Sequence, residues 1–278
     1  MIEILKAILF GIVEGVTEWL PVSSTGHLIL LNEFMNLQIS DEFRSMFDVV
    51  IQLGAILAVI VLFFHKLNPF SPKKTGQERK LTWDLWLKVI AAIIPSGILG
   101  VLFDDWMDEH LHNGIVVSIA LIVYGIAFIL VERRNQNRWE GRHQKQEDVY
   151  HLGWGPAMVI GASQCLSLIP GTSRSGSTIL GGIMVGVSRS VAAEFSFFMA
   201  IPTMVGASGI KALKFLASGV SATGSEIMIL VVGCVVSFLV SLLVIKGLME
   251  YVRNHSFASF GVYRIILGIV VLIYFLVK

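Results

Sequence analysis

The chain has 278 residues, of which 55% are hydrophobic and 15% charged, with a formal net charge of +1 and a mean hydropathy of +0.76. A soluble domain carries about a quarter charged residues, so this composition excludes an ordinary cytosolic enzyme, a disordered chain and a nucleic-acid-binding protein. Cys165 and Cys234 lie in apolar runs without metal-type spacing, which argues against a disulfide scaffold or a zinc site and leaves a polytopic membrane protein.

Six segments are apolar and long enough to predict membrane-spanning helices, which need about 20 mostly apolar residues. We therefore expect an all-α polytopic membrane protein. The predicted spans are Phe47–Phe64, Leu85–Phe103, Ile115–Val131, Ala192–Ala212, Ile227–Ile245 and Phe260–Val277.

The charges of the loops predict the orientation of these spans, because cytoplasmic loops carry an excess of Lys and Arg. The first and third loops are basic, whereas the second, Asp104 to His112, has four acidic residues and no Lys or Arg. We expect the basic loops in the cytoplasm and the acidic one outside. The fourth loop, with Lys211 and Lys214 near its start, is an exception to this pattern.

Two further apolar stretches, Ile4–Leu31 and Val159–Val187, are interrupted by Pro, Gly, Ser, Thr and charged residues. Each interruption predicts two half-length helices around a polar turn. Such a segment enters the membrane and leaves on the same side when protein surrounds it. We therefore expect two re-entrant helix hairpins in addition to the six spans.

An offset of 150 residues aligns several features of the two broken stretches, including Gly11 with Gly161 and Ser23 with Ser173. This weak match indicates two repeats, 1–140 and 141–278, each with one hairpin followed by three spans. Since three is odd, the second repeat enters from the opposite side. In such inverted-topology repeats the broken helices meet near the midplane, and their N-termini face an anionic ligand.

The first broken stretch carries the residues best suited to catalysis. Glu14 and Glu18 are four residues apart and share one helix face, and carboxylates inside a membrane are costly and usually functional. Ser23, Ser24 and Thr25 are N-cap candidates for the second half-helix, whose N-terminus would bind an anion. The alternative for the two glutamates is a pair that caps or snorkels at the outer interface.

Ser24 is the candidate nucleophile, and His27, three residues later, the candidate acid or base. Glu18, with Glu14 behind it, would orient His27 or hold a divalent cation, magnesium or calcium; no organic cofactor is expected. Direct attack by a water molecule stays open as the alternative mechanism.

The second broken stretch, Pro170 to Thr178, is rich in Gly, Ser and Thr, which let backbone N–H groups approach a ligand. Arg174 is the only Arg in this stretch, and its planar fork matches phosphate oxygens. The alternative is a structural ion pair with Glu14 or Glu18, which would still permit phosphate binding. The predicted phosphate-binding residues are Ser23, Thr25, Gly26, Thr172, Ser173, Arg174, Ser175, Gly176 and Thr178.

The motifs Glu14-x-x-x-Glu18, Pro21-Val-Ser-Ser-Thr-Gly-His27 and Pro170-Gly-Thr-Ser-Arg-Ser-Gly176 closely resemble the undecaprenyl-diphosphate phosphatase family, the bacitracin-resistance proteins. The resemblance extends over essentially the whole chain. It implies an enzyme of the bacterial cell membrane that removes the terminal phosphate of a C55-isoprenyl diphosphate and regenerates the lipid carrier of peptidoglycan synthesis. Carried over by motif, the implied functional positions are Glu14, Glu18, Ser23, Ser24, His27, Ser173, Arg174 and Thr178.

The expected partners are therefore a polyprenyl diphosphate and the membrane lipids, with no nucleic acid. The oligomeric state is left open, a homodimer included. An inverted repeat is also a transporter architecture, so a lipid-phosphate flippase or ion-coupled carrier is the rival function. The pairing of Ser24 with His27 favours the enzyme, because a carrier has no need of a nucleophile.

Overall fold

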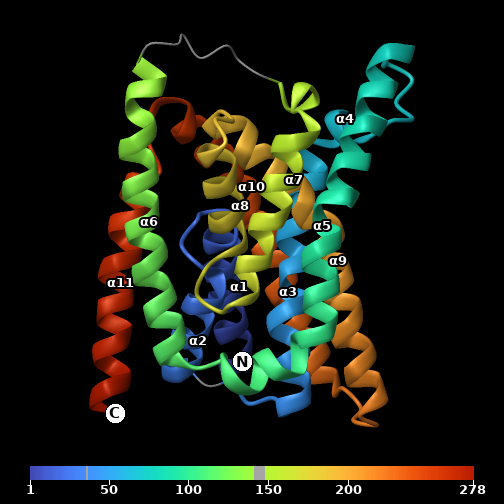
Figure 1. The fold of residues 1–278 in the computed structure, drawn as a ribbon. Coiled ribbons are helices and arrows are strands. Elements are labelled where there is room, and N and C mark those ends of the chain that lie inside the picture. Colours follow the sequence, from blue (N-terminus) through green and yellow to red (C-terminus); the bar gives the residue numbers. More distant parts are fainter. Residues whose placement is uncertain (36, 141–147) are drawn as a thin grey trace.

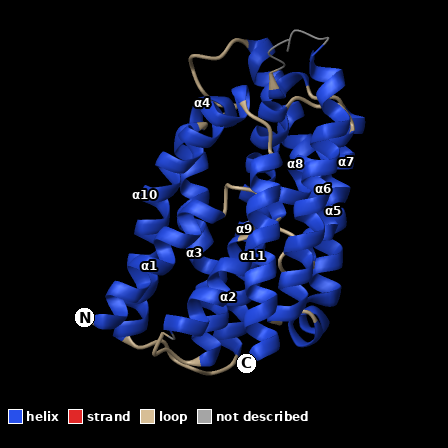
Figure 2. Cartoon of the chain, turned by 90° about the vertical axis from the view of Figure 1, so that its left-hand side faces the viewer, coloured by secondary structure: helices blue, strands red, loops and turns tan. Residues whose placement is uncertain are grey.

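The computed structural model describes residues 1–35, 37–140 and 148–278, and within these ranges the chain folds into helices joined by turns and loops, without a strand (Figures 1 and 2). Asn36 and 141–147 lie outside the described residues, and with them Arg142 and Lys145 of the basic third loop. The helices are α1 (Ile2–Thr17), α2 (Ser24–Met35), α3 (Asp41–Leu62), α4 (Phe64–Leu67), α5 (Gly76–His110), α6 (Gly114–Glu140), α7 (Trp154–Gln164), α8 (Arg174–Met184), α9 (Arg189–Ala217), α10 (Gly224–Asn254) and α11 (Ala258–Val277), with the short 3₁₀ helices η1 (Val149–His151) and η2 (Cys165–Leu168).

The six predicted spans are confirmed as helices long and apolar enough to cross a membrane: Asp41–Leu62, Gly76–Phe103, Gly114–Asn135, Arg189–Ala217, Gly224–Asn254 and Ala258–Val277. Several of these helices begin earlier than the apolar segments, because capping and not hydropathy determines where a helix starts. At Thr75 and Thr223 the hydroxyl accepts the N–H of Glu78 and of Glu226, and each glutamate accepts the threonine N–H in return.

Both broken stretches fold as pairs of short helices, α1 with α2 and α7 with α8, and Figure 1 shows their turns at mid-height in the molecule. The turns end on Ser23 and Ser173, whose φ angles are 74° and 72°. Their hydroxyls accept the N–H of Gly26 (3.3 Å) and of Gly176 (3.1 Å). Of the three cap candidates in the first stretch, Ser23 is the one that caps, and the cap at Ser173 was not predicted. A positive φ is uncommon outside glycine, so the two turns share an unusual local geometry.

The helices around the two hairpins are paired in a similar way. Helix α1 lies along α10, and α7 lies along α5; α10 also packs on α3, and α5 on α9. A glycine permits close approach in each hairpin. A Cβ on Gly11 would lie 2.6 Å from the carbonyl oxygen of Gly233, and a Cβ on Gly161 would lie 2.3 Å from that of Ala92. Small residues at equivalent positions thus fix the contacts of α1 and α7.

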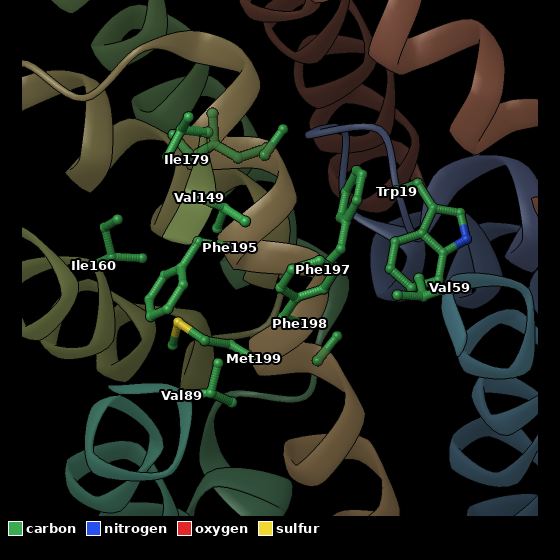
Figure 3. Packing of buried hydrophobic residues seen from close by; sticks show 14 of the residues in the cluster. Trp19, Val59, Val89, Val149, Ile160, Ile179, Phe195, Phe197, Phe198 and Met199 are labelled. Atoms are coloured by element: carbon green, nitrogen blue, oxygen red, sulfur yellow. The ribbon is translucent and has the colours of Figure 1, made fainter. Parts of the chain in front are cut away.

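Helix α9 supplies the middle of the larger core, as Figure 3 shows for Phe195, Phe197 and Met199. These side chains are fully buried and therefore serve packing. The ring of Trp19, in the first turn, packs edge-on against Phe197 with centroids 5.0 Å apart. The core therefore anchors the turn between α1 and α2 against α9.

The basic start of the fourth loop has a local explanation. Lys214, near the end of α9, forms an ion pair of 2.8 Å with Asp105, near the end of α5. Most of the acidic segment that was predicted as the second loop thus belongs to α5, which ends at His110, and its Asp105 compensates the charge of Lys214.

Candidate active site

The two turns bring Ser24, Glu18 and Arg174 into one hydrogen-bonded chain. The hydroxyl of Ser24 donates to Oε2 of Glu18 at 2.7 Å, and the other oxygen, Oε1, accepts from Nη2 of Arg174 at 2.7 Å. Ser24 and Glu18 are buried, and the Arg174 side chain is 10% exposed. Residues 156 positions apart in sequence therefore share one site, and a serine hydroxyl points at a carboxylate that an arginine holds in place.

Arg174 is also held from α9. Its Nη1 donates to the carbonyl oxygen (2.8 Å) and the hydroxyl (3.2 Å) of Ser196, and its guanidinium lies 5.7 Å from the centre of the Trp19 ring. Its Nε is buried without a hydrogen-bond partner among the described residues. The ion pair that the sequence left as the alternative role of Arg174 is thus present, with Glu18, and one buried donor is left over for a ligand.

The turns also touch each other directly. The hydroxyl of Ser175 lies 3.1 Å from the carbonyl oxygen of Glu18 and 3.3 Å from that of Leu20. Ser175 therefore joins the start of α8 to the first turn. As a result, the N-terminus of α8 lies beside the turn that leads into α2, and free N–H groups at such ends attract anions.

His27 has partners other than those expected. Its Nδ1 lies 2.7 Å from the carbonyl oxygen of Ser23, and its Nε2 lies 2.7 Å from the hydroxyl of Tyr263 in α11. A carbonyl can only accept, so Nδ1 carries a proton and donates it to Ser23. Glu18 does not orient His27 in this structure, and Ser24 donates to Glu18 instead of His27.

Glu14 is completely buried, and neither of its carboxylate oxygens has a hydrogen-bond partner among the described residues. Glu18 lies at the end of the same helix, and its N–H donates to the carbonyl oxygen of Glu14 at 3.0 Å. The described part of the chain contains no group of three or more His, Cys, Asp or Glu side chains placed to hold a metal ion. Glu14 and Glu18 are the two carboxylates near the turn. Magnesium is often held by one or two carboxylates together with substrate phosphates.

The other predicted residues lie in the same two turns, with different partners. The hydroxyl of Thr178 contacts that of Ser196 (2.6 Å), whereas Thr172 donates to the carbonyl oxygens of Leu166 and Ile169 within its own loop. Thr25 and Gly26 belong to the first turn of α2. Thr172 thus shapes the turn, and its hydroxyl is not aimed at the Ser24 site.

Three residues near this site were missed by sequence reasoning, namely Ser196, Tyr263 and Arg264. Arg264 donates to the carbonyl oxygens of Pro21, Gly171 and Thr172, so it contacts both turns. A lone arginine in the last apolar span was a signal of the kind that identified Arg174. Ser196 and Tyr263 carry no such local signal.

An apolar groove adjoins the site. Its volume is about 600 Å³, and it lies between the first turn and helices α10 and α11. Tyr263 both lines this groove and bonds to His27, so the groove is continuous with the polar residues of the turn. The lining residues are Val16, Thr17, Leu20, Val22, Gly247, Leu248, Tyr251, Ser259, Phe260 and Tyr263.

A second pocket, of about 390 Å³, is polar. Its lining includes Arg44, Asp41 and Glu226, at the start of α3 and of α10. None of the predicted site residues lines this pocket.

Comparison with known proteins identifies close relatives. The family model described as bacitracin resistance protein BacA matches residues 7–270. The chain is 58% identical over 278 residues to a protein named undecaprenyl-diphosphatase from Streptococcus thermophilus, covering 100% of this chain and 95% of the relative. It is 55% identical over 271 residues to one of the same name from Enterococcus faecalis, covering 98% and 97%. A relative from Limosilactobacillus fermentum is 57% identical over 275 residues, covering 99% and 98%.

Proposed function

Because the chain belongs to the BacA family of undecaprenyl-diphosphatases, whose model and relatives match it almost from end to end, we propose that its diphosphatase chemistry takes place where the two turns meet. The protein is an undecaprenyl-diphosphatase that confers bacitracin resistance. The observation that carries the proposed location is the chain of bonds from Ser24 through Glu18 to Arg174. The relatives are named as hydrolases, which favours the enzyme over a carrier without catalysis.

In the proposed reaction, the Ser24 hydroxyl attacks the terminal phosphorus of the substrate. A bond forms between Oγ and phosphorus, and the bond to the bridging oxygen breaks, so that undecaprenyl phosphate leaves. Glu18 takes the hydroxyl proton across the existing 2.7 Å hydrogen bond. A water molecule then hydrolyses the phosphoserine, which releases phosphate and restores the serine.

Arg174 supplies positive charge in this scheme. Phosphoryl transfer needs mainly positioning and charge neutralisation, and the guanidinium has an unpartnered Nε and is held by Ser196. Nδ1 of His27 donates to the carbonyl oxygen of Ser23, and Nε2 shares a hydrogen bond with the hydroxyl of Tyr263. We assign to His27 and Tyr263 the exchange of protons with the leaving group or the attacking water.

Glu14 and Glu18 are the residues we propose for a divalent cation, magnesium or calcium. Two oxygens of Glu14 are buried without a partner, which fits a cation ligand better than a structural carboxylate. When bound, the cation would neutralise charge on the diphosphate oxygens. No organic cofactor enters the proposal.

The apolar groove is the place we propose for the first isoprene units of the substrate. A polyprenyl diphosphate has a small anionic head and a long apolar tail, so its site must join a polar pocket to an apolar path. Tyr263 stands at that junction, since its hydroxyl faces His27 and its ring lines the groove.

The proposal includes how the two hairpins and the six spans lie in the membrane. The matched turns at Ser23 and Ser173, and the matched pairing of α1 with α10 and α7 with α5, support re-entrant hairpins and an inverted repeat of halves 1–140 and 141–278. With bacterial relatives and six candidate spans, the protein is assigned to the bacterial cell membrane, with the basic loops in the cytoplasm. The oligomeric state stays open, a homodimer included.

Phosphate release from undecaprenyl diphosphate by detergent-solubilised protein tests the proposed mechanism, because transport requires two compartments and hydrolysis does not. Ser24→Ala should lower turnover by roughly three orders of magnitude or more while substrate still binds. Ser208→Ala is the matched control, because it removes a buried hydroxyl that bonds to the carbonyl oxygen of Val49 and to neither turn; it should remain within a few-fold of wild type. A fully active Ser24→Ala would eliminate the phosphoserine and leave direct attack by water.

A further inference from the structure

Arg264 is a buried cation with an unusual set of partners. Its side chain is completely buried in α11. Nη1 donates to the carbonyl oxygen of Pro21 at 3.0 Å, and Nη2 donates to those of Gly171 at 2.7 Å and Thr172 at 2.9 Å. One guanidinium therefore bonds to the backbone of both turns that build the site.

The charge of Arg264 is not neutralised by any carboxylate of the described residues. Two half-buried arginines are each paired with a carboxylate, Arg174 with Glu18 and Arg189 with Glu132. Arg264 instead has only carbonyl oxygens and the face of Tyr124, 5.5 Å from the ring centre, and its Nε has no hydrogen-bond partner in the described part of the chain. Arginine stays protonated in proteins, and a buried charge is costly unless it is paired.

The backbone at the start of α8 makes room for this guanidinium. A Cβ on Gly176 would lie 3.0 Å from Nη1 of Arg264. Gly176 is in the first turn of α8, where Ser173 caps the helix and Arg174 begins it. The positive group thus lies directly against the N-terminal turn that the proposed site offers to the diphosphate.

We propose that Arg264 is a positioning residue for the diphosphatase reaction, which holds the two turns in register and supplies a positive charge that the anionic diphosphate of the substrate neutralises. This inference rests on the proposed location of the site. Carbonyl hydrogen bonds alone explain why the turns stay together. These hydrogen bonds leave the positive charge of Arg264 without a negative partner. A diphosphate bound between the N-termini of α2 and α8 would supply the negative charge.

Two substitutions separate the effect of the positive charge of Arg264 from the effect of its hydrogen bonds to both turns. Arg264→Gln removes the charge and keeps an amide donor, whereas Arg264→Lys keeps the charge and loses the fork that spans both turns. The readouts are the thermal midpoint, kcat and KM for undecaprenyl diphosphate, and the affinity for inorganic phosphate measured as product inhibition. Arg189→Gln is the matched control, because it removes a half-buried arginine that pairs with Glu132, away from the turns.

We expect Arg264→Gln to weaken phosphate affinity by at least about tenfold, because it removes a buried positive charge that attracts the phosphate through a medium of low effective dielectric constant. Arg264→Lys should keep phosphate affinity within about threefold while kcat falls about tenfold, because one ammonium cannot replace the bonds to both turns. Arg189→Gln should lower the thermal midpoint and leave phosphate affinity unchanged.

The inference is overturned if the Gln and Lys variants lose phosphate affinity equally, or if neither loses it. If Arg264→Gln does not fold, Arg264→Lys decides alone: a folded Lys variant that no longer binds phosphate contradicts the role of the charge. Fully active Ser24→Ala and Arg174→Lys variants would instead show that the site itself is wrongly placed. Loss of activity in those two, with wild-type phosphate affinity in Arg264→Gln, would refute only the inference on Arg264.

Discussion

Replacement of Arg174 by lysine tests whether the arginine fork, and not only its charge, serves the reaction. The guanidinium uses Nη2 for Glu18 and Nη1 for Ser196, at 2.7 and 2.8 Å, and keeps Nε for a ligand. A lysine ammonium is a single point of charge on a flexible stem and cannot hold all of these directions at once. At least one hydrogen bond to a charged group is therefore lost.

Such a bond is worth about 1.5–3 kcal/mol, which corresponds to about a 10- to 150-fold change in rate. We expect Arg174→Lys to lower kcat/KM for undecaprenyl diphosphate by at least this factor, while membrane insertion and yield stay normal. Arg189→Lys is the control, because Arg189 makes an equally close two-point pair with Glu132 at 2.6 and 3.0 Å. That variant should lose stability and keep its turnover.

The assay is phosphate release by purified protein in detergent, with both variants brought to the same concentration of folded protein. Turnover of Arg174→Lys within about threefold of wild type, a difference of less than 1 kcal/mol, would refute the reasoning. Arg174 would then be a structural partner of Glu18, and the phosphate would be bound by other groups.

Three further predictions follow from the turns, the groove and the loops. Ser23→Ala should lower stability by about 1 kcal/mol through the lost helix cap and reduce turnover only a few-fold, as thermal denaturation and phosphate release would record; a loss as large as that of Ser24→Ala would contradict the capping role. Gly247→Leu should raise KM for C55 and C15 isoprenyl diphosphates more than for a C5 diphosphate, because a Cβ on Gly247 meets nothing within 4 Å and the leucine side chain would fill the groove. Gly209→Leu is the control, because Gly209 is equally open and does not line the groove. Equal effects of the two changes would contradict the groove as the site of the isoprene units. In a background without native cysteines, a membrane-impermeant thiol reagent should label Gln38→Cys from outside intact cells and leave Lys73→Cys unlabelled, and the reverse pattern would invert the proposed orientation.

The spans and the location of the turns could be predicted from sequence because both depend on local composition. Apolar length gave the six spans, and Pro, Gly and Ser inside the two remaining stretches indicated where those helices break. Residue type indicated Ser23 as one of three cap candidates, whereas the matching cap at Ser173 was not predicted. The starts of the helices were harder to predict from sequence, because threonine caps extend α5 and α10 beyond their apolar parts.

The partners within the site could not be predicted, because they come from distant segments. His27 bonds Tyr263 across 236 positions, and Arg174 bonds the backbone of Ser196 in a third helix. No spacing rule connects such residues. Arg264 was within reach of sequence reasoning, because an arginine inside an apolar span is costly and usually functional, but its contact with both turns required the fold.

A structure with a non-hydrolysable diphosphate analogue bound would decide whether the two turns form one phosphate site. The account predicts the terminal phosphorus between the N-termini of α2 and α8, with Ser24 Oγ at an attack distance of about 3–3.5 Å and the guanidinium of Arg174 on the phosphate oxygens. The apolar tail should enter the groove beside Tyr263. A diphosphate bound in the polar pocket at Arg44, or at any place out of reach of Ser24 and Arg174, would contradict it.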